Sequence, residues 1–266
     1  MRAAGATAVA AHSFAPASDV IVFRARLLDG ADTTVYARPY PLDRVEPHVV
    51  RLPRPEPLAA WCARGGVEHA IVGGFFVRDG GVPLGELRTA GVRRRSEPFL
   101  APWHELRSCV HVDGGELGLA PRRELPSDPR GDLLQAGPLL VREGRSLMRD
   151  GMDPEGFSAG AEQFDSDITA GRHPRAALGL AGPLAWAVAC DGRAEGEAGL
   201  TLSELAALMV RLGARTAINL DGGGSTSLVC GGGLVNVPRE QEGTFIPGGR
   251  PVCTVVTFEE RACGHG

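Results

Sequence analysis

The sequence predicts an α+β fold, a single domain (residues 1–266) with a large twisted sheet of mixed or mostly antiparallel strands and a few helices. Many short segments have the apolar alternation or clustering of strands, whereas few have helical spacing. The helical segments do not alternate strictly with the strands, as they would in a doubly wound parallel sheet. With 266 residues, 43% of them hydrophobic, the chain can bury a substantial core, and it contains no internal repeat.

The first elements expected are a hairpin and a connector, over residues 1–56. The alternating segments DVIVFRARLL and TTVYARPY flank the turn residues DGAD and predict a β-hairpin. The proline-rich segment RLPRPEP is interpreted as a connector. LAAWCARGG then predicts a short helix that ends at glycine.

The middle of the chain predicts strands separated by a long irregular region. EHAIVGGFFV indicates a buried strand with a glycine break, and RSCVHVDGG indicates another strand that closes on a turn. Residues 120–175 are rich in Pro, Gly and Asp and predict few regular elements. AALGL and LAWAVACDG indicate two further strands.

The clearest helix runs from Thr201 to Leu212. Thr201 and Glu204 match a capping box, and Gly213 supplies the stop signal. Apolar residues recur with helical spacing at Leu202, Leu205, Met209 and Leu212.

The last segments predict strands joined by glycine turns. RTAINL indicates a strand, and STSLVC is interpreted as its partner across the glycine stretch. A further turn, GGG, leads into LVNV, and PVCTVVTFE indicates the final strand.

Composition excludes several function classes. The formal net charge is −4 and no basic stripe is evident, which argues against a nucleic-acid partner. All 28 basic residues are arginine, a bias typical of a GC-rich bacterial genome. The six cysteines have no CxxC spacing, so they predict neither a zinc site nor a disulfide framework. No apolar run approaches the roughly 18 residues of a membrane span.

The N-terminus is alanine-rich and lacks a strong signal-peptide core, and His12 interrupts it. We therefore expect a cytoplasmic protein. The sequence leaves the oligomeric state open.

The segment INLDGGGSTSLV, residues 218–229, is the most informative stretch. Asp221 ends an apolar run and is followed by three glycines, Gly222, Gly223 and Gly224, and then by three hydroxyl residues, Ser225, Thr226 and Ser227. The stretch lacks the patterns of a P-loop, a GxSxG nucleophile elbow and a calcium loop. Successive glycines let backbone N–H groups converge on an anion, and Ser225 and Thr226 can add donors. A tight turn without function explains the same residues.

A second candidate segment is RHPR, with Arg172, His173 and Arg175 within four residues. Two guanidiniums and an imidazole suit recognition of a phosphate, although a solvated charged loop is the simpler interpretation. Carboxylates that could pair with these cations precede the segment: Glu162, Asp165 and Asp167. Gln135 precedes a Gly-Pro turn and is interpreted either as structural or as a site residue, and Asp191 is more typical of a turn.

Several segments in order resemble the phosphodiester glycosidase family. They are QAGPLLVREG (135–144), RHPRAALGL (172–180), residues 191–229 from DGR through LDGGGSTSLV, VNVP (235–238) and RPV (250–252). The resemblance extends from about residue 70 to about residue 260. It maps the family's Asp-Gly-Gly-Gly-Ser onto Asp221 to Ser225, its Asn before Leu-Asp onto Asn219, and its His-Pro-Arg onto His173 to Arg175. Gln135 and Asn236 fall on further family positions.

The sequence departs from the family pattern at two positions. Val72 stands where the family has Asn before Gly-Gly-(Phe/Tyr)-Phe, and Ala176 replaces the usual Thr after His-Pro-Arg. The family is often exported, whereas no export signal is evident in this sequence.

The resemblance implies hydrolysis of a sugar-1-phosphodiester, which releases the sugar from a phosphate monoester. Asp221 would be the carboxylate that activates water or attacks, and Asp167 a reserve acid. His173, Arg175 and Arg172 would contact the phosphate together with Gly222 to Thr226, and Gln135 or Asn219 would orient the sugar. No metal or other cofactor is expected. Two alternatives stay open, an inactive sugar-phosphate-binding module and a metal-dependent phosphodiesterase.

Overall fold

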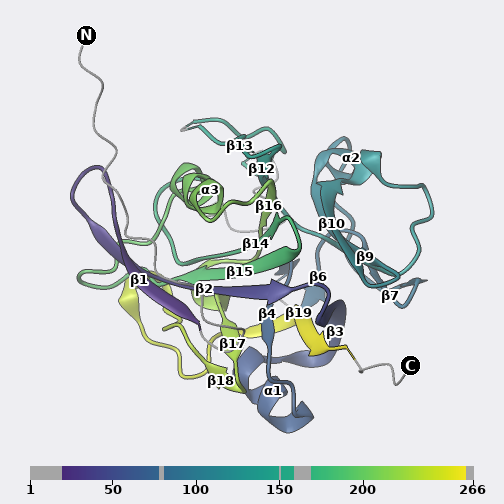
Figure 1. The fold of residues 1–266 in the computed structure, drawn as a ribbon, viewed down its shortest axis with the longest axis horizontal. Coiled ribbons are helices and arrows are strands. Elements are labelled where there is room, and N and C mark those ends of the chain that lie inside the picture. Colours follow the sequence, from purple (N-terminus) through teal and green to yellow (C-terminus); the bar gives the residue numbers. More distant parts are fainter. Residues whose placement is uncertain (1–19, 78–80, 150, 159–168, 262–266) are drawn as a thin grey trace.

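The structure is a computed structural model that describes residues 20–77, 81–149, 151–158 and 169–261. Strands are its main regular structure, and every ladder in its sheets is antiparallel. Three α-helices lie in the described residues. The predicted α+β class, with mostly antiparallel strands and few helices, is confirmed. The strands are divided among a seven-stranded sheet and two five-stranded sheets (Figure 1).

The first sheet has seven strands and contains the predicted N-terminal hairpin, β1 paired with β2. From one edge to the other its strands are β1 (Ile21–Arg26), β2 (Asp32–Pro41), β15 (Leu184–Cys190), β14 (Arg175–Ala181), β16 (Thr216–Asn219), β12 (Leu139–Arg142) and β13 (Arg145–Ser146). Because β2 pairs with β15 along its length, the hairpin extends this sheet.

The second sheet has five strands and joins the N-terminal part of the chain to the C-terminal strand. In order, they are β18 (Gly233–Leu234), β17 (Leu228–Cys230), β4 (Ala70–Val72), β19 (Pro251–Glu260) and β3 (Val45–Pro57). The final strand predicted from PVCTVVTFE is confirmed as β19.

The third sheet lies to one side of the other two (Figure 1). Its strands are β10 (Glu116–Pro121), β9 (Ser108–Asp113), β11 (Asp132–Gln135), β7 (Leu87–Thr89) and β8 (Val92–Arg93). A separate two-stranded sheet pairs β5 (Phe76–Val77) with β6 (Val82–Pro83).

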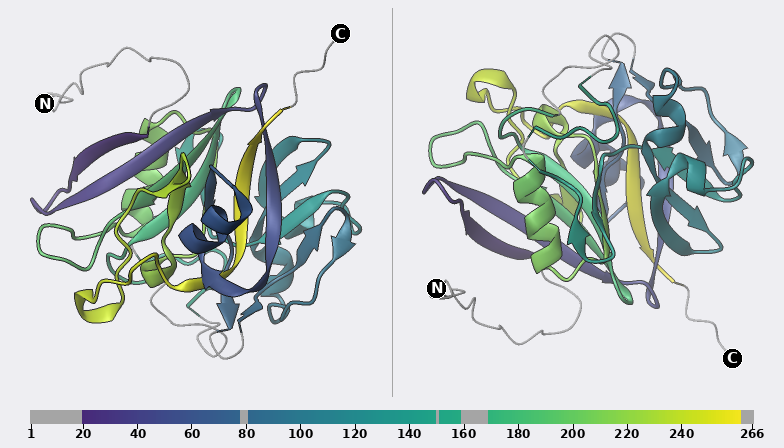
Figure 2. Two further views of the ribbon diagram at one scale, coloured as in Figure 1. Left: turned by 90° about the horizontal axis from the view of Figure 1, so that it is seen from below. Right: turned by 90° about the horizontal axis from the view of Figure 1, so that it is seen from above.

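The helices cover different sides of the sheets. In Figure 2, α1 (Leu58–Gly65) faces the viewer in the left view and α3 (Leu202–Arg211) in the right view. The third helix, α2 (Trp103–Leu106), adjoins the third sheet, and short 3-10 turns occur at Arg122–Glu124 (η1), Gly223–Ser225 (η3) and Gln241–Gly243 (η4). Helix α3 begins at the predicted capping box: Thr201 Oγ1 accepts from the Glu204 amide, and the Glu204 carboxylate accepts from the Thr201 amide.

Both faces of the central strands of the first sheet, β14, β15 and β16, are buried, which explains their nearly continuous apolar sequences. In β14, Leu178 belongs to a core cluster shared with the second and third sheets, whereas the adjacent Ala177 packs in the cluster under α3. In β16, Ile218 belongs to the first of these clusters and Ala217 to the cluster under α3. Since successive side chains of a strand point to opposite faces, a strand buried on both faces needs apolar residues at every position.

Two predictions about loops are wrong. The proline-rich segment RLPRPEP is the second half of β3, a strand at the edge of the second sheet. An edge strand leaves alternate N–H groups unpaired, so it tolerates prolines that a central strand would not. The region 120–175 contains the buried strands β11 and β12, which are too short for a clear periodic signal.

No helix in the described part of the chain is both long and apolar enough to cross a lipid bilayer.

Candidate active site

The glycine stretch after Asp221 crosses from the first sheet to the second. Strand β16 ends just before it, η3 occupies its centre, and β17 follows. The predicted hairpin between these two strands is wrong, because they pair in different sheets. The Leu220 amide donates to the Ala176 carbonyl of β14 at 2.9 Å, whereas the Ser227 carbonyl accepts from the Val72 amide of β4 at 3.0 Å. The turn is therefore the connection that brings the two sheets together.

Asp221 lies at this junction and is half-buried. Its amide donates to the Gly73 carbonyl at 2.9 Å, and its Oδ1 accepts from the Gly222 amide at 2.9 Å. Cys253 of β19 is close enough for the Asp221 charge to affect it: burial raises the pKa of the Cys253 thiol to about 12, and Asp221 acts in the same direction. The carboxylate is thus held at the boundary of two sheets with part of its surface exposed.

The amides of the turn donate within the protein. Gly222 donates to the preceding carboxylate, and Gly223 donates to the carbonyl of Pro174 at 2.9 Å. The amides of Ser225 and Thr226 donate to the carbonyls of Gly222 and Gly223, the pattern of a 3-10 turn. These four N–H groups therefore have acceptors within the protein in this structure.

The hydroxyl residues of the turn are buried. Ser225, Thr226 and Ser227 have no exposed surface, and within the described residues their side-chain oxygens have no hydrogen-bond partner. Asn219 is also buried: its Nδ2 donates to the carbonyls of Gly137 and Leu220. In this structure Asn219, Ser225 and Thr226, all predicted to bind substrate, point into the protein.

A C-terminal loop supports the turn from outside. Asn236 Oδ1 accepts from the Leu228 amide and its Nδ2 donates to the Thr226 carbonyl, both at 2.9 Å. The Arg250 amide donates to the Gly224 carbonyl at 3.0 Å, and the Arg250 side chain pairs with Glu240.

The structure places the RHPR segment beside the turn. Besides the Pro174 bond to Gly223, a β-carbon built on Gly222 would lie 2.9 Å from the Pro174 carbonyl and 3.9 Å from Arg175 Cδ. Only a glycine fits at position 222 without moving that backbone. Two parts of the predicted site, far apart in sequence, therefore lie together.

The arginines of this segment have different environments. Arg172 pairs with Glu204 of α3 and with Asp29 of the β1–β2 turn, both at 2.6 Å, and these hydrogen bonds raise its pKa. The positive charge of Arg172 is therefore already balanced by these carboxylates. Arg175 is only 2% exposed; its Nε donates to the Leu200 carbonyl at 3.0 Å and its Nη2 to the Gly171 carbonyl at 3.3 Å.

Gln135 is held on all sides by the protein. Its Nε2 donates to the carbonyls of His104 and Arg107 at 2.8 and 3.2 Å, and its Oε1 accepts from the Glu86 amide at 3.0 Å. With 1% exposure, it fixes the start of the Gly-Pro turn. Asp167, the predicted reserve acid, lies outside the described residues.

The two departures from the family pattern are core positions. Val72 of β4 and Ala176 of β14 are fully buried in the cluster shared by the sheets. Apolar side chains suit both places.

The structure adds Arg193, which the sequence prediction missed. Its guanidinium lies against Gly223: a β-carbon built there would be 3.2 Å from Nη1 and 3.3 Å from Nη2. His173 Nδ1 lies 3.3 Å from Arg193 Nη2. The only sequence signal was the Asp191-Gly192-Arg193 triplet, whose first residue is typical of a turn.

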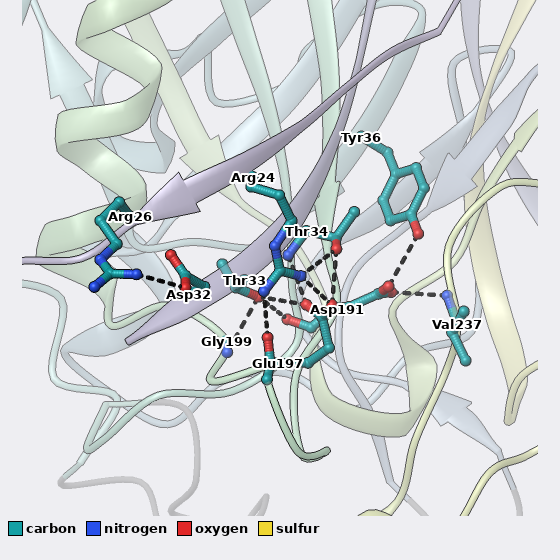
Figure 3. A network of polar contacts seen from close by, with 11 residues as sticks. Arg24, Arg26, Asp32, Thr33, Thr34, Tyr36, Asp191, Glu197, Gly199 and Val237 are labelled. Atoms are coloured by element: carbon teal, nitrogen blue, oxygen red, sulfur yellow. Dashed lines mark hydrogen bonds and ion pairs between the residues drawn. The ribbon is translucent and has the colours of Figure 1, made fainter. Parts of the chain in front are cut away.

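Asp191 anchors the loop that carries Arg193 (Figure 3). Its Oδ2 accepts from the Tyr36 hydroxyl at 3.0 Å and its Oδ1 from the Val237 amide at 2.8 Å. Its carbonyl accepts from the Thr33 hydroxyl at 2.8 Å. Further along the loop, Glu197 accepts from the Thr34 amide at 2.6 Å. The loop is therefore tied to β2 at both of its ends.

Burial raises the pKa of Asp191 above its usual range, despite hydrogen bonds from Val237 and Tyr36 that lower it. A carboxyl with a raised pKa in the folded state stabilises the fold fully below its unfolded pKa of about 3.9, and this contribution is lost as pH rises through the folded pKa. We expect the stability advantage of the wild type over D191N, which cannot titrate, to decrease above about pH 4. Urea unfolding of both proteins from pH 4 to 7 checks this. An advantage that grows with pH contradicts it.

Within the described residues, no three His, Cys, Asp or Glu side chains gather as ligands of a metal ion would.

Comparison with known proteins places these features in a family. Residues 65–259 match the family model of the phosphodiester glycosidases. No curated protein matches the sequence significantly.

Solved structures share the fold. The catalytic domain of zebrafish N-acetylglucosamine-1-phosphodiester α-N-acetylglucosaminidase, auto-inhibited by its pro-peptide, matches with a TM-score of 0.68 and 20% identity over 94% of this chain and 86% of that chain. A hypothetical protein from Synechocystis matches with a TM-score of 0.61 and 17% identity, over 93% of this chain and 64% of that chain. A proposed exported protein from Burkholderia pseudomallei K96243 matches with a TM-score of 0.61 and 17% identity, over 86% of this chain and 74% of that chain. Since the family model covers most of the sequence, the chain belongs to the phosphodiester glycosidase family.

Proposed function

We propose that the protein hydrolyses a sugar-1-phosphodiester and releases the sugar from a phosphate monoester. The observation that carries the proposal is the position of Asp221: a half-buried carboxylate at the junction of two sheets, in the turn whose Gly223 bonds to Pro174 of the Arg-His-Pro-Arg segment. The family is that of phosphodiester glycosidases, and the zebrafish structure carries an activity of this class in its name.

The chemistry needs few groups. The bond between C1 of the sugar and the bridging oxygen breaks, and the phosphate takes the electron pair. Water supplies the hydroxyl of the released sugar and one proton. A glycosidase usually needs an acid to protonate the leaving oxygen. A phosphate leaves as a stable anion, so one carboxylate that activates water or attacks C1, with cations near the phosphate, is enough.

Two alternatives make different predictions. A sugar-phosphate-binding module that has lost catalysis, which the departures at Val72 and Ala176 would allow, binds glycosyl phosphates without turnover. A metal-dependent phosphodiesterase breaks the P–O bond instead of the C–O bond.

Hydrolysis in ¹⁸O-labelled water distinguishes the three functions. Cleavage of the C–O bond places the label on C1 of the sugar and none on phosphorus. Cleavage of the P–O bond places it on the phosphate, where ³¹P NMR detects it as an isotope shift. We propose to screen a panel of sugar-1-phosphodiesters in this way, with aryl glycosides of the same sugars as controls. Label on phosphorus, or saturable binding without turnover, contradicts the proposed hydrolysis.

We further propose that the protein acts in the cytoplasm. Fractionation of cells that express a C-terminally tagged chain tests this, and recovery from the medium or periplasm contradicts it.

A further inference from the structure

Arg193 has an unusual backbone conformation. Its φ is +61°, in the left-handed region that residues with a β-carbon rarely adopt. The residue before it, Gly192, packs closely on the RHPR segment, since a β-carbon built there would lie 2.8 Å from the Pro174 nitrogen. Residues in such conformations persist only where their surroundings fix them, and they are concentrated at functional sites. Here the anchors are the Asp191 hydrogen bonds shown in Figure 3.

The Arg193 side chain reaches the turn that follows Asp221. Its Nη1, Nη2 and Cζ atoms would lie 3.2 to 3.5 Å from a β-carbon on Gly223, so the guanidinium packs against this glycine. The φ of Gly223 is +60°. A glycine at this position therefore serves both the backbone turn and the approach of the cation.

His173 fixes the orientation of Arg193. The ring nitrogen Nε2 lies 2.8 Å from the Ala170 carbonyl, which can only accept a hydrogen bond, so Nε2 carries the proton. In the neutral ring, Nδ1 is then the acceptor, and it faces Arg193 Nη2 at 3.3 Å. Arg193 Nη1 donates in addition to the Arg239 carbonyl at 3.4 Å. The imidazole thus binds the guanidinium with the nitrogen that could otherwise contact a substrate.

We propose that Arg193 binds the phosphate group of the substrate at the Asp221 turn, and that His173 is a positioning residue that acts through Arg193. The inference rests on the proposed function. Among the neighbouring arginines, Arg172 is paired with two carboxylates and Arg175 is almost completely buried. Arg193 is half-buried, and its planar fork of donors matches the oxygens of a phosphate.

The test measures binding without catalysis. The probe is a C-glycosyl methylphosphonate monoester, which keeps the sugar and a singly charged phosphorus group but replaces the C1–O bond that the proposed reaction cleaves with a C–C bond. Calorimetry gives its Kd for the wild type, R193Q, R193K, H173A and the double variant R193Q/H173A. R142Q is the matched control, because it removes the same charge from Arg142 of β12, which forms an exposed pair with Glu124 of η1.

We expect R193Q to raise Kd about ten- to a hundredfold, R193K to raise it less, and R142Q to leave it within about twofold. If His173 acts through Arg193, H173A weakens binding in the wild type but adds little in the R193Q background. Losses that multiply in the double variant mean that His173 contacts the phosphate itself, and they overturn its positioning role. Melting temperatures confirm that each variant is folded.

The outcomes separate this inference from the proposed function. A wild-type protein that binds the phosphonate, with R193Q binding equally well, overturns the role of Arg193 alone. A wild-type protein that neither binds the phosphonate nor turns over a diester overturns the proposed function, and the inference with it.

Discussion

Asp221→Asn is expected to lower kcat on a sugar-1-phosphodiester by about a hundred- to ten-thousandfold, the usual cost of losing a general base or nucleophile. Asparagine has the same shape, and its side-chain oxygen can still accept from the Gly222 amide, so the turn should keep its conformation. It can neither take a proton from water nor attack C1. The measurement is steady-state turnover of the diester identified in the screen.

The matched control is Asp128→Asn. This carboxylate is 88% exposed and pairs with Arg88, in a loop beside the third sheet. It should turn over substrate at the wild-type rate. If D221N keeps a kcat within a few-fold of wild type while its melting temperature is unchanged, Asp221 is not the reacting carboxylate.

Gly199→Ala is expected to lower the free energy of unfolding by about 3 kcal/mol or more, from strain and a steric clash together. The φ of Gly199 is +77°, and its β-carbon would lie 2.5 Å from the His173 carbonyl oxygen and 2.6 Å from its carbonyl carbon. Because backbone cannot rotate away as a side chain can, the backbone around His173 must shift. Such a loss lowers the melting temperature of a domain of this size by roughly 6–12 °C.

Gly196→Ala separates the two causes. Gly196 lies in the same loop with φ +70°, but the nearest atom to its β-carbon, Arg24 Nη2, is 4.0 Å away. This variant carries only the conformational cost of alanine in the left-handed region, about 1–2 kcal/mol. Thermal unfolding of both variants, followed by circular dichroism, gives the difference. Equal losses would mean that the contact with His173 contributes nothing.

Local patterns predicted most elements of the fold but not their long-range pairing. The capping box at Thr201 and the hairpin around residue 30 depend on neighbours in sequence, and both are confirmed. The strands on either side of the glycine turn were also recognised. Their partners were not, since nothing in the turn indicates that β16 pairs with β14 and β17 with β4. A proline-rich strand such as β3 looks like a connector because its edge position is a property of the whole sheet.

The candidate site was predicted from residue types, and the structure adds the geometry of these residues. The sequence singled out Asp221 and the RHPR segment, and the structure brings them together. It could not show that Arg172 is matched by Glu204 and Asp29, since those carboxylates come from distant elements. Arg193 was missed because a positive φ at an arginine has no sequence pattern. The glycines in the sequence also could not show that the amides of the turn donate to acceptors within the protein.

The pairing of β3 with β19 has a consequence for synthesis of the protein. Residues 45–57 pair with residues 251–260, so β3 leaves the ribosome long before its partner exists. At about 5–20 residues per second, the delay is on the order of ten to forty seconds. During that time an apolar edge is available to chaperones or to other nascent chains. Because β19 also pairs with β4 and carries Cys253 near Asp221, the surroundings of the Asp221 turn are complete only when translation has passed residue 260.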